Sequence, residues 1–589
     1  MAKYDSFHFS PCNDRTILMP RHDKRIPLER PARPMRMGKR AFTQDGVNPD
    51  APYAPVNLGI FHVDTQINGI PKHYAVYVPA SMTSKGFALL LFLPSHKKAE
   101  EALLEGWQDI ADRQGVTLLM MENEWNREEL SEAFDYAQDV IDHQFQRREI
   151  TDIGEATIYP YGEGDAAGIA TAYALVYSAT YPAFAADGDC SIDPALLDLL
   201  NTLPSDGIDG LPKKNVPLPG ILIDRKDNAQ PVADYICQTL CADDDGLSNT
   251  FAHVYLQKAY RGQHFINEQA VGQLWYATPD TVGEQGIQTL RMQTVSFLKR
   301  FSRWGGYGNC HLRRTRLPED VGIRRVWKSI NGYKRFWDVY VPSYYRADEQ
   351  KKYPLVLAIH GFSCNASYFE QTSDWDRVAE ERGFIVVFAS AYPQKSAISA
   401  YALPAWDCIG NGGLDEIPYF TQLLDEIIAE YNIDTERVYA VGHSNGGMAT
   451  FMLMDKMPER FAAFGPTGSL VGMVQQENFL SHGILCPVYN MVGEYDLFGA
   501  QVNTPEDGAW QSINKLCALN KATFNNENWY DNGRYHTLVL YDAQHRPVVR
   551  YTEMKGCPHT YTPGMSELTW DDFLCHFSRK ADGSIEYKG

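Results

Sequence analysis

The sequence Arg-Val-Tyr-Ala-Val-Gly-His-Ser-Asn-Gly-Gly at residues 437–447 decides the fold of this chain. Its β-branched first half predicts a buried strand, and the apolar spacing of residues 448–454 predicts a helix directly after the Gly-x-Ser-x-Gly turn. Strand, sharp turn and helix in this order make a nucleophile elbow, which exposes the hydroxyl of Ser444 on a strained backbone. Gly442 and Gly446 are needed because a Cβ at either position would collide with the neighbouring strand or helix. An ordinary tight turn between strand and helix is the alternative.

Length and composition limit the kind of protein. The chain has 589 residues, too many for one hydrophobic core, so we expect two large domains. Hydrophobic residues make up 44% of the chain, as in a globular protein. The sequence contains no run of about 20 apolar residues, so we expect no transmembrane helix. The formal net charge of −20 argues against nucleic acids and anionic membranes as partners.

The cysteines and the first residues bear on the compartment. There are 11 Cys, an odd number without a Cys-x-x-Cys pair, which fits reduced thiols better than a disulfide framework. The N-terminus shows no apolar segment typical of a secretory signal. We therefore expect a cytoplasmic protein, with secretion as the alternative.

Residues 1–50 differ from the acidic remainder of the chain because they are rich in Arg, Lys and Pro. We predict an irregular basic arm that lies along the acidic body or on a partner subunit. A tail that binds a polyanion is the alternative. If the protein forms a homo-oligomer, this arm or the N-terminal half is the expected interface.

The chain contains an internal duplication. Ile-Asn-Gly at 67–69 followed by Val-Tyr-Val-Pro at 76–79 reappears with the same spacing at 330–332 and 339–342. Each copy continues with a buried-strand run and a Trp-led helix pattern that ends at a glycine. The predicted domains are a basic arm (1–50), a degenerate first unit (51–305), a linker (306–325) and a catalytic second unit (326–589).

The order of the predicted elements indicates the fold class. Apolar strands alternate with amphipathic helices in both copies, which predicts an α/β fold with a mostly parallel sheet covered by helices on both faces. Ligands bind such sheets at the carboxyl ends of the strands. His360, Ser444, Asp496 and His559 all lie at or just beyond predicted strand ends.

A serine at an elbow needs an acid and a base, in the chain order Ser, Asp or Glu, His. Asp496 follows the predicted strand 487–493 and is the expected acid, with Glu494 as the alternative. His559 is the expected base because it ends a strand-then-loop pattern. The other histidines after Asp496 fall in hairpin-like segments (His536, His545) or in the terminal helix (His576).

The strand that ends at Ile359 runs into His360-Gly361-Phe362, a turn that presents a backbone N–H to an oxyanion in serine hydrolases. We expect the N–H groups of Phe362 and Asn445 to form the oxyanion hole. Six side chains near these motifs are candidates for binding substrate, with packing in the core as the alternative for the aromatic ones. They are His360, Trp406, Tyr419, His443, Tyr495 and Tyr561.

The first copy lacks this chemistry. In our alignment His360-Gly361 corresponds to Pro94-Ser95, and Gly442-His443-Ser444-Asn445 corresponds to Gly162-Glu163-Gly164-Asp165, so a glycine replaces the nucleophile. Asp227 and His264 are interpreted as relics of the acid and the base. The first unit is therefore predicted to be catalytically degenerate.

The C-terminal unit resembles the polyhydroxybutyrate depolymerase and feruloyl esterase group of α/β-hydrolases. The N-terminal unit resembles the group only in its scaffold. The matching motifs are the Val-Tyr-Val-Pro strand, Leu355-Val356-Leu357 leading to His360-Gly361, Ala405-Trp406-Asp407-Cys408, Leu414-Asp415-Glu416-Ile417, Tyr431-x-Ile433-Asp434 leading to Arg437-Val438-Tyr439, the Gly-His-Ser-Asn-Gly-Gly-Met elbow and Phe461-Ala462-Ala463.

The resemblance implies a serine carboxylesterase that hydrolyses esters of hydroxy or aromatic acids with no cofactor and no metal. It leaves open a disulfide between Cys364 and Cys408, since the family often pairs a cysteine after His-Gly with one beside the Trp. Without a visible polymer-binding module, a small-molecule ester is the expected partner. An acyltransferase that uses the same triad and a non-catalytic protein that binds esters are the alternatives.

Overall fold

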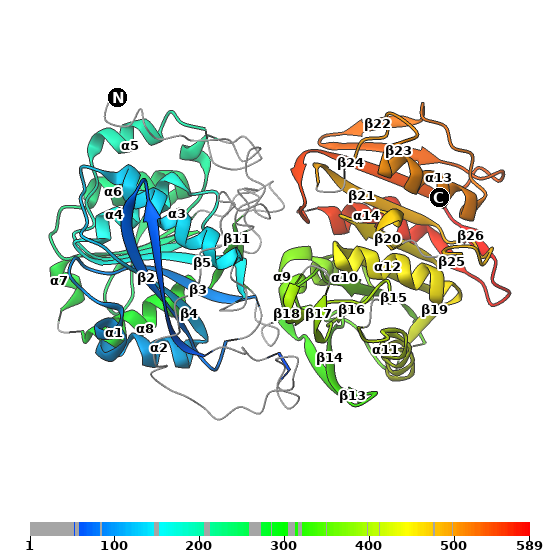
Figure 1. Ribbon diagram of the computed structural model, residues 1–589, viewed down its shortest axis with the longest axis horizontal. Coiled ribbons are helices and arrows are strands. Elements are labelled where there is room, and N and C mark those ends of the chain that lie inside the picture. Colours follow the sequence, from blue (N-terminus) through cyan, green and yellow to red (C-terminus); the bar gives the residue numbers. More distant parts are fainter. Residues whose placement is uncertain are drawn as a thin grey trace. The chain divides into compact units, whose positions relative to one another are not determined.

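A computed structural model describes residues 52–53, 58–82, 85–146, 152–204, 212–257, 272–283, 285–303, 312–315, 321–348, 350–396, 399–410, 413–474, 478–496, 499–562 and 564–589. They form two compact units (Figure 1). Unit 1 comprises the described residues between 58 and 315, and unit 2 those between 321 and 589 together with Pro52 and Tyr53. The predicted arm, residues 1–50, lies outside the described residues.

The predicted linker, 306–325, needs a correction at its described positions. Leu312–Arg314 forms a strand, β12, that pairs with β11 (Phe301–Arg303) in a small antiparallel sheet of unit 1. Leu312 is fully buried there, which explains why this stretch folds with unit 1. At the other end β13 of unit 2 already begins at Arg324.

Unit 1 is built on one ten-stranded sheet. Its strands are β1 (Gly59–Ile67), β2 (Ile70–Val78), β3 (Gly86–Phe92), β4 (Val116–Glu122), β5 (Ile153–Gly164), β6 (Phe184–Gly188), β7 (Gly220–Asp224), β8 (Ala242–Ser248), β9 (His253–Gln257) and β10 (Gln273–Ala277). Its helices are α1 (Ala99–Ala102), α2 (Gln108–Gln114), α3 (Leu130–Gln146), α4 (Ala167–Val176), α5 (Pro194–Leu200), α6 (Gln230–Leu240), α7 (Pro279–Val282) and α8 (Ile287–Leu298).

Unit 2 also contains one ten-stranded sheet. Its strands are β13 (Arg324–Ile330), β14 (Tyr333–Tyr340), β15 (Tyr353–Ile359), β16 (Ile385–Ala389), β19 (Ile433–His443), β20 (Ala463–Thr467), β21 (Val488–Tyr495), β22 (Trp529–Asn532), β23 (Tyr535–Leu540) and β24 (Val549–Pro558). Two small sheets pair β17 (Pro393–Ser396) with β18 (Ser399–Pro404) and β25 (Phe577–Arg579) with β26 (Ile585–Tyr587). Its helices are α9 (Ala366–Ser373), α10 (Trp375–Arg382), α11 (Ile417–Glu430), α12 (Asn445–Lys456), α13 (Gly508–Asn520) and α14 (Met565–Asp572).

The two large sheets have the same strand order. It is β1-β2-β4-β3-β5-β6-β7-β10-β9-β8 in unit 1 and β13-β14-β16-β15-β19-β20-β21-β24-β23-β22 in unit 2. In both, neighbouring strands of the centre run parallel, from β4 to β10 and from β16 to β24, and antiparallel strands flank them on each side. The predicted α/β class is confirmed, and each sheet is mixed with a parallel centre.

Two local features recur at equivalent places. The turns β1–β2 and β13–β14 each place an Asn and a Gly at positive φ, Asn68 at +51° with Gly69 at +82° and Asn331 at +51° with Gly332 at +83°. Two consecutive residues at positive φ make a type I′ turn, which suits the twist of a two-residue hairpin. The repeated Ile-Asn-Gly sequence therefore encodes the same hairpin twice.

A buried arginine near the end of each unit makes equivalent hydrogen bonds to backbone carbonyl groups. Arg303 donates to the carbonyl oxygens of Tyr181 and Pro217, and Arg579 donates to those of Phe461 and Leu485. Because a buried guanidinium must find acceptors, each arginine holds two loops at the amino-end side of its sheet. The sequence Phe-Ser-Arg occurs at 301–303 and again at 577–579, and its arginine makes equivalent hydrogen bonds in both units.

Burial alternates along the central strands of unit 1 and gives two hydrophobic layers. Leu90, Phe92 and Leu119 pack on one face with residues of α3, α4, α5 and α6. Leu89 and Leu91 pack on the other face with residues of α1, α2 and α8. Such double cover leaves the strand ends as the places where polar chemistry can lie. Within the described residues, no helix is long and apolar enough to cross a membrane.

Candidate active site

Ser444 lies between β19 and α12, with φ +58° and ψ −119°. A positive φ is rare for a residue with a side chain and is characteristic of functional turns. Two glycines make the turn possible. A Cβ on Gly442 would lie 2.2 Å from the carbonyl oxygen of Gly446, and a Cβ on Gly446 would lie 2.1 Å from that of Ile359. The strand-turn-helix elbow predicted from residues 437–447 is the arrangement observed.

The structure brings the predicted nucleophile, base and acid together. His559 Nε2 lies 2.8 Å from Ser444 Oγ, and His559 Nδ1 lies 2.9 Å from Asp496 Oδ2. Asp496 follows β21 directly, and its side chain is fully buried. Because an ionised carboxylate only accepts hydrogen bonds, Nδ1 carries the proton, and Nε2 is left to accept from the serine hydroxyl.

Glu494, the alternative acid, is engaged elsewhere. Its Oε2 accepts a hydrogen bond from the N–H of Gly556 at 2.8 Å. Lys555 lies within 3.9 Å of its other oxygen. The structure therefore places Asp496, and not Glu494, against the imidazole.

The turn that contains Phe362 lies against the nucleophile, and Asn445 follows Ser444 in the chain. A Cβ on Gly361 would lie 3.2 Å from Ser444 Cβ, so the turn after β15 passes directly against the serine. No hydrogen-bond acceptor among the described residues engages the N–H of Phe362 or of Asn445. Asn445 is also the first residue of α12, where N–H groups are unpaired and the helix dipole favours negative charge.

The side chain of Asn445 fastens the helix start to a neighbouring loop. Its Oδ1 accepts from the N–H of Trp406 at 2.7 Å, and its Nδ2 donates to the carbonyl of Trp406 at 3.1 Å. This pair of bonds fixes the peptide that carries the oxyanion donor. Cys408 Sγ lies 3.7 Å from the same Nδ2. Neither Cys364 nor Cys408 is part of a disulfide, so the disulfide left open by the resemblance is not formed.

His443 packs against His559, the predicted base. Its ring lies 5.0 Å from the ring of His559 and makes an edge contact with Tyr561, and its Nδ1 lies 3.2 Å from Thr467 Oγ1. Burial, and the neighbouring His559, hold the pKa of His443 well below its usual value, so it is neutral. Gly468 gives the two rings room, because a Cβ there would lie 2.8 Å from His443 Cε1 and 3.1 Å from His559 Cε1.

Four of the six predicted substrate residues lie in the core, which corrects their predicted role. His360, Trp406, Tyr419 and Tyr561 are at most 3% exposed. Their polar atoms are engaged by protein groups: Trp406 Nε1 donates to the carbonyl of His360, Tyr419 Oη donates to that of Phe336, and Tyr561 Oη is 2.7 Å from Ser566 Oγ. These four side chains therefore support the site as part of the core. His443 borders the catalytic side chains, and Tyr495 is 47% exposed at the end of β21.

His360 shows why its side chain is internal. Its Nδ1 donates to the carbonyl of Gly361 at 2.7 Å, and its Nε2 accepts from the N–H of Ala391 at 2.9 Å. Burial lowers the pKa of His360 to about 3, since a charged ring would have no solvent. The neutral ring thus ties the oxyanion turn to the end of β16.

Sequence reasoning missed a buried ion pair beneath these aromatic rings. Arg335 Nη1 lies 2.9 Å from Glu416 Oε2, and its guanidinium lies over the ring of Tyr419, 3.8 Å from the centroid. Glu416 also accepts from Gln394 Nε2 at 3.2 Å. The only signal was an arginine placed at an inward position of β14, whose partner lies far along the chain.

Unit 1 carries a counterpart of this site without its reactive groups. Phe92 pairs with Gly162 in unit 1, and Ile359 pairs with Gly442 in unit 2. This register corrects the alignment of the first turn by one residue, because Pro94 now corresponds to Gly361. The contacts agree: a Cβ on Gly164 would lie 3.3 Å from Pro94, as that of Gly361 approaches Ser444.

The elbow shape persists in unit 1, since Gly164 has φ +60°. The N–H of Ser95, the counterpart of the Phe362 donor, is bonded to Asp165 Oδ1 at 3.0 Å, and Ser95 Oγ donates to Oδ2 at 2.5 Å. In unit 1 a carboxylate of the chain itself therefore engages the N–H that corresponds to the expected donor Phe362.

The interpretation of His264 as a relic base is corrected by the strand order. His264 lies outside the described residues, in the segment that joins β9 to β10. The base of unit 2 follows β24, which corresponds to β10, and residues 278–286 after β10 contain no histidine. Asp227, the proposed relic acid, is exposed in the turn after β7.

A comparison with protein families finds a match within unit 2. Residues 332–545 match the family model Esterase, described as "Putative esterase". A bifunctional acetylxylan esterase/xylanase of Neocallimastix patriciarum is 34% identical over 145 residues, which are 24% of this chain and 19% of that protein. Feruloyl esterase B of Talaromyces funiculosus is 26% identical over 125 residues, 21% of this chain and 33% of that protein.

Among solved structures, an acetyl xylan esterase from Aspergillus awamori covers 42% of this chain and 98% of its own, with 17% identity and a TM-score of 0.31. The chain spans between 19% and 39% of the length of the first curated relatives that it matches. Within the described ranges, no group of three or more His, Cys, Asp or Glu side chains is arranged to hold a metal ion.

Proposed function

We propose that this protein is a serine carboxylesterase and that unit 2 performs the reaction. The observation that carries the proposal is the continuous contact from Asp496 through His559 to Ser444, with both distances below 3 Å at the end of an elbow strand. Hydrogen-bonded nucleophile, base and orienting acid are the geometry that acyl transfer needs.

In the proposed reaction His559 takes the proton of Ser444 through Nε2 as the serine oxygen attacks the ester carbonyl. The carbonyl oxygen becomes an oxyanion, which the N–H groups of Phe362 and Asn445 stabilise by about 3 kcal/mol each. His559 then gives its proton to the leaving alcohol, and an acyl-serine remains. Water repeats the sequence, with His559 again as the base, and releases the acid.

The substrates proposed are small esters of hydroxy or aromatic acids. The family match and the acetylxylan and feruloyl esterases among the relatives support an ester whose acid is short or aromatic. The exposed ring of Tyr495, directly before Asp496, is the aromatic surface available to stack on such an acid. Polyhydroxybutyrate-type hydroxy esters belong to the same proposal.

We further propose that unit 1 arose by duplication and is a pseudo-enzyme. The identical strand order, the two I′ hairpins and the paired arginines Arg303 and Arg579 support a common origin. Gly164 at the nucleophile position, Asp165 on the Ser95 N–H and the lack of a histidine in residues 278–286, directly after β10, support the loss of activity.

The test compares wild type with Ser444→Ala on p-nitrophenyl acetate, p-nitrophenyl butyrate, methyl ferulate and an ester of the 3-hydroxybutyrate dimer. We expect turnover of at least one ester by wild type and none above background by the variant. Methyl ferulate as the preferred ester would identify an aromatic acyl pocket. Turnover that survives in Ser444→Ala, or no turnover of any ester by wild type, would contradict the proposal.

A further inference from the structure

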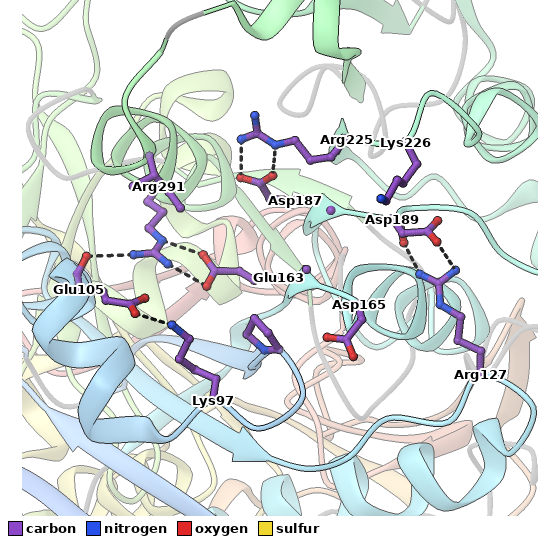
Figure 2. Close-up of a pocket in the computed structure, with 14 residues that line it drawn as sticks. Lys97, Glu105, Arg127, Glu163, Asp165, Asp187, Asp189, Arg225, Lys226 and Arg291 are labelled. Atoms are coloured by element: carbon purple, nitrogen blue, oxygen red, sulfur yellow. Dashed lines mark hydrogen bonds and ion pairs between the residues drawn. The ribbon is translucent and has the colours of Figure 1, made fainter.

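Unit 1 contains a cavity of about 620 Å³ at the carboxyl ends of β5, β6 and β7 (Figure 2). Gly164 and Gly188 line it, so it occupies the place in unit 1 that Ser444 and Gly468 occupy in unit 2. Ligand pockets typically measure about 300–1,000 Å³, so the cavity has the size of a binding site. The former active site is thus still a pocket, although its reactive groups are gone.

The lining of this cavity is charged and balanced. Five basic and five acidic side chains face it. Arg291 holds Glu163 through two hydrogen bonds of 2.7 and 2.9 Å, and both side chains are buried. Arg225 likewise makes a bidentate contact with Asp187, with hydrogen bonds of 2.6 and 3.0 Å. Figure 2 shows these two pairs on neighbouring sides of the cavity.

The remaining carboxylates are also engaged. Arg127 Nη1 lies 3.1 Å from Asp189 Oδ2, and Lys97 donates to Glu105. Asp165 accepts from the N–H and the hydroxyl of Ser95. The negative charge of Asp165 is balanced by the positive charge of Lys226. No carboxylate among the described residues lies within ion-pair distance of Lys226. The cavity therefore has no formal net charge.

This balance disfavours a charged ligand. An anion gains little from cations already neutralised by bidentate carboxylates, and burying its charge is costly. The anion position inherited from the oxyanion hole is filled by Asp165 itself. What remains free are the outer N–H groups of Arg225, the ammonium of Lys226 and the unused lone pairs of the carboxylates. These donors and acceptors lie around one space.

We propose that this cavity binds a neutral carbohydrate of one to three sugar rings. A hydroxyl both donates and accepts, so a row of hydroxyls satisfies such a mixed lining without bringing charge. The ring of Pro94 and the half-exposed side chain of Ile287 give apolar surface for the C–H face of a sugar. Unit 1 is then a non-catalytic sugar-binding unit of the same chain.

The test is calorimetric titration of the full chain carrying Ser444→Ala, so that no ester chemistry interferes. The probes are xylotriose, cellotriose and maltotriose, with acetate and inorganic phosphate as ionic probes. We expect at least one trisaccharide to bind saturably, with an affinity that added salt leaves unchanged because no net charge is involved. Asp165→Ala and Lys226→Ala, both at exposed side chains, should each weaken binding by about tenfold.

Asp198→Ala and Lys214→Ala are the matched controls, since they remove the same charges from exposed positions of unit 1 outside the cavity lining. They should bind the sugar like the parent chain. Three results would overturn the proposal: no trisaccharide binds, the sugar binds equally well to the cavity variants, or acetate or phosphate binds instead with an affinity that falls with salt. None of these results depends on whether unit 2 hydrolyses esters.

Discussion

The two elbows of this chain have the same backbone and opposite chemistry. Gly164 and Ser444 follow the equivalent strand, have φ +60° and +58°, and lie against equivalent turns. In unit 2 the serine contacts a histidine that an aspartate orients. In unit 1 the elbow residue has no hydroxyl, and the next residue, Asp165, accepts from the N–H of the corresponding turn with its carboxylate. The elbow backbone therefore also forms around a residue that has no nucleophilic group.

The comparison distinguishes the residues that determine the fold of the site from those that determine its reactivity. Strand order, hairpins, buried arginines and elbow dihedrals are common to both units, and they depend on glycine positions and apolar alternation. The differences include four polar positions: Ser444, Asn445, Asp496 and His559. Exchanging residues between the units tests whether these few positions are sufficient.

The largest effect should come from Ser444→Gly, which installs in unit 2 the residue of unit 1. We expect esterase activity to fall by about 10⁶-fold, as for loss of other triad serines. The fold should persist, because glycine adopts φ +58° without strain. Rates on p-nitrophenyl acetate and thermal unfolding would be measured together. A Ser444→Gly chain that is unfolded would show that the serine, and not the elbow glycines, holds the turn.

Asn445→Asp should have the next largest effect, since it copies Asp165 into unit 2. A carboxylate beside the developing oxyanion opposes its charge, and it no longer donates to the Trp406 carbonyl that fixes the loop. We expect kcat to fall by about 10²–10³-fold, the usual effect of losing an oxyanion donor. KM should change much less.

The control for Asn445→Asp is Asn528→Asp, the same charge change at an exposed position of unit 2. It should retain wild-type kcat. If Asn445→Asp also retained it, the capped turn of unit 1 would not by itself be a reason for inactivity.

A pH dependence should distinguish the units, because the position of His360 is held by Leu93 in unit 1. Burial lowers the pKa of His360 to about 3 from 6.5, so between these values the unfolded chain binds one more proton than the folded chain. The free energy of unfolding of unit 2 then falls by about 1.4 kcal/mol per pH unit below pH 6.5, or about 2 kcal/mol at pH 5. Above pH 6.5 the full contribution is present.

His360→Leu imports the unit 1 residue and should remove this slope. Urea unfolding at pH 7 and pH 5 would be compared in wild type and variant. The variant should be less stable at pH 7, because the N–H of Ala391 loses its acceptor, at a cost of about 1–3 kcal/mol. Its loss between pH 7 and pH 5 should be smaller than that of wild type. Equal losses would contradict the assignment of the slope to His360.

The sequence was sufficient for the fold class and for the contacts of Ser444, Asp496 and His559. An elbow flanked by strand and helix, and the order acid then base at later strand ends, leave few arrangements. It was insufficient for His360, Trp406, Tyr419 and Tyr561, which lie next to motifs in sequence but point into the core. Which side of a strand end a side chain takes depends on packing that no local pattern records.

Long-range pairs explain the other differences. Arg335 and Glu416 meet only once β14 and the start of α11 are packed, and neither residue alone predicts a buried ion pair. The Asp165–Ser95 contact required the strand register, in which a shift of one residue changes every partner. His264, interpreted as a relic base, precedes β10 in the sequence, whereas the base position of unit 2 follows the corresponding strand β24.

The smallest effect should come from Gly164→Ser, the reverse exchange. At φ +60° a serine is strained, and its Cβ would lie 3.3 Å from Pro94, so we expect unit 1 to lose about 1–2 kcal/mol of stability. Activity should not appear, because Asp165 still caps Ser95 and residues 278–286, directly after β10, contain no histidine. Esterase assays of the double variant Gly164→Ser/Ser444→Ala give the sharpest reading, since unit 2 is then silent. A measurable rate would mean that a base reaches the elbow of unit 1 from outside the described residues. The hydroxyl at the elbow would then account for the difference in activity between the two units.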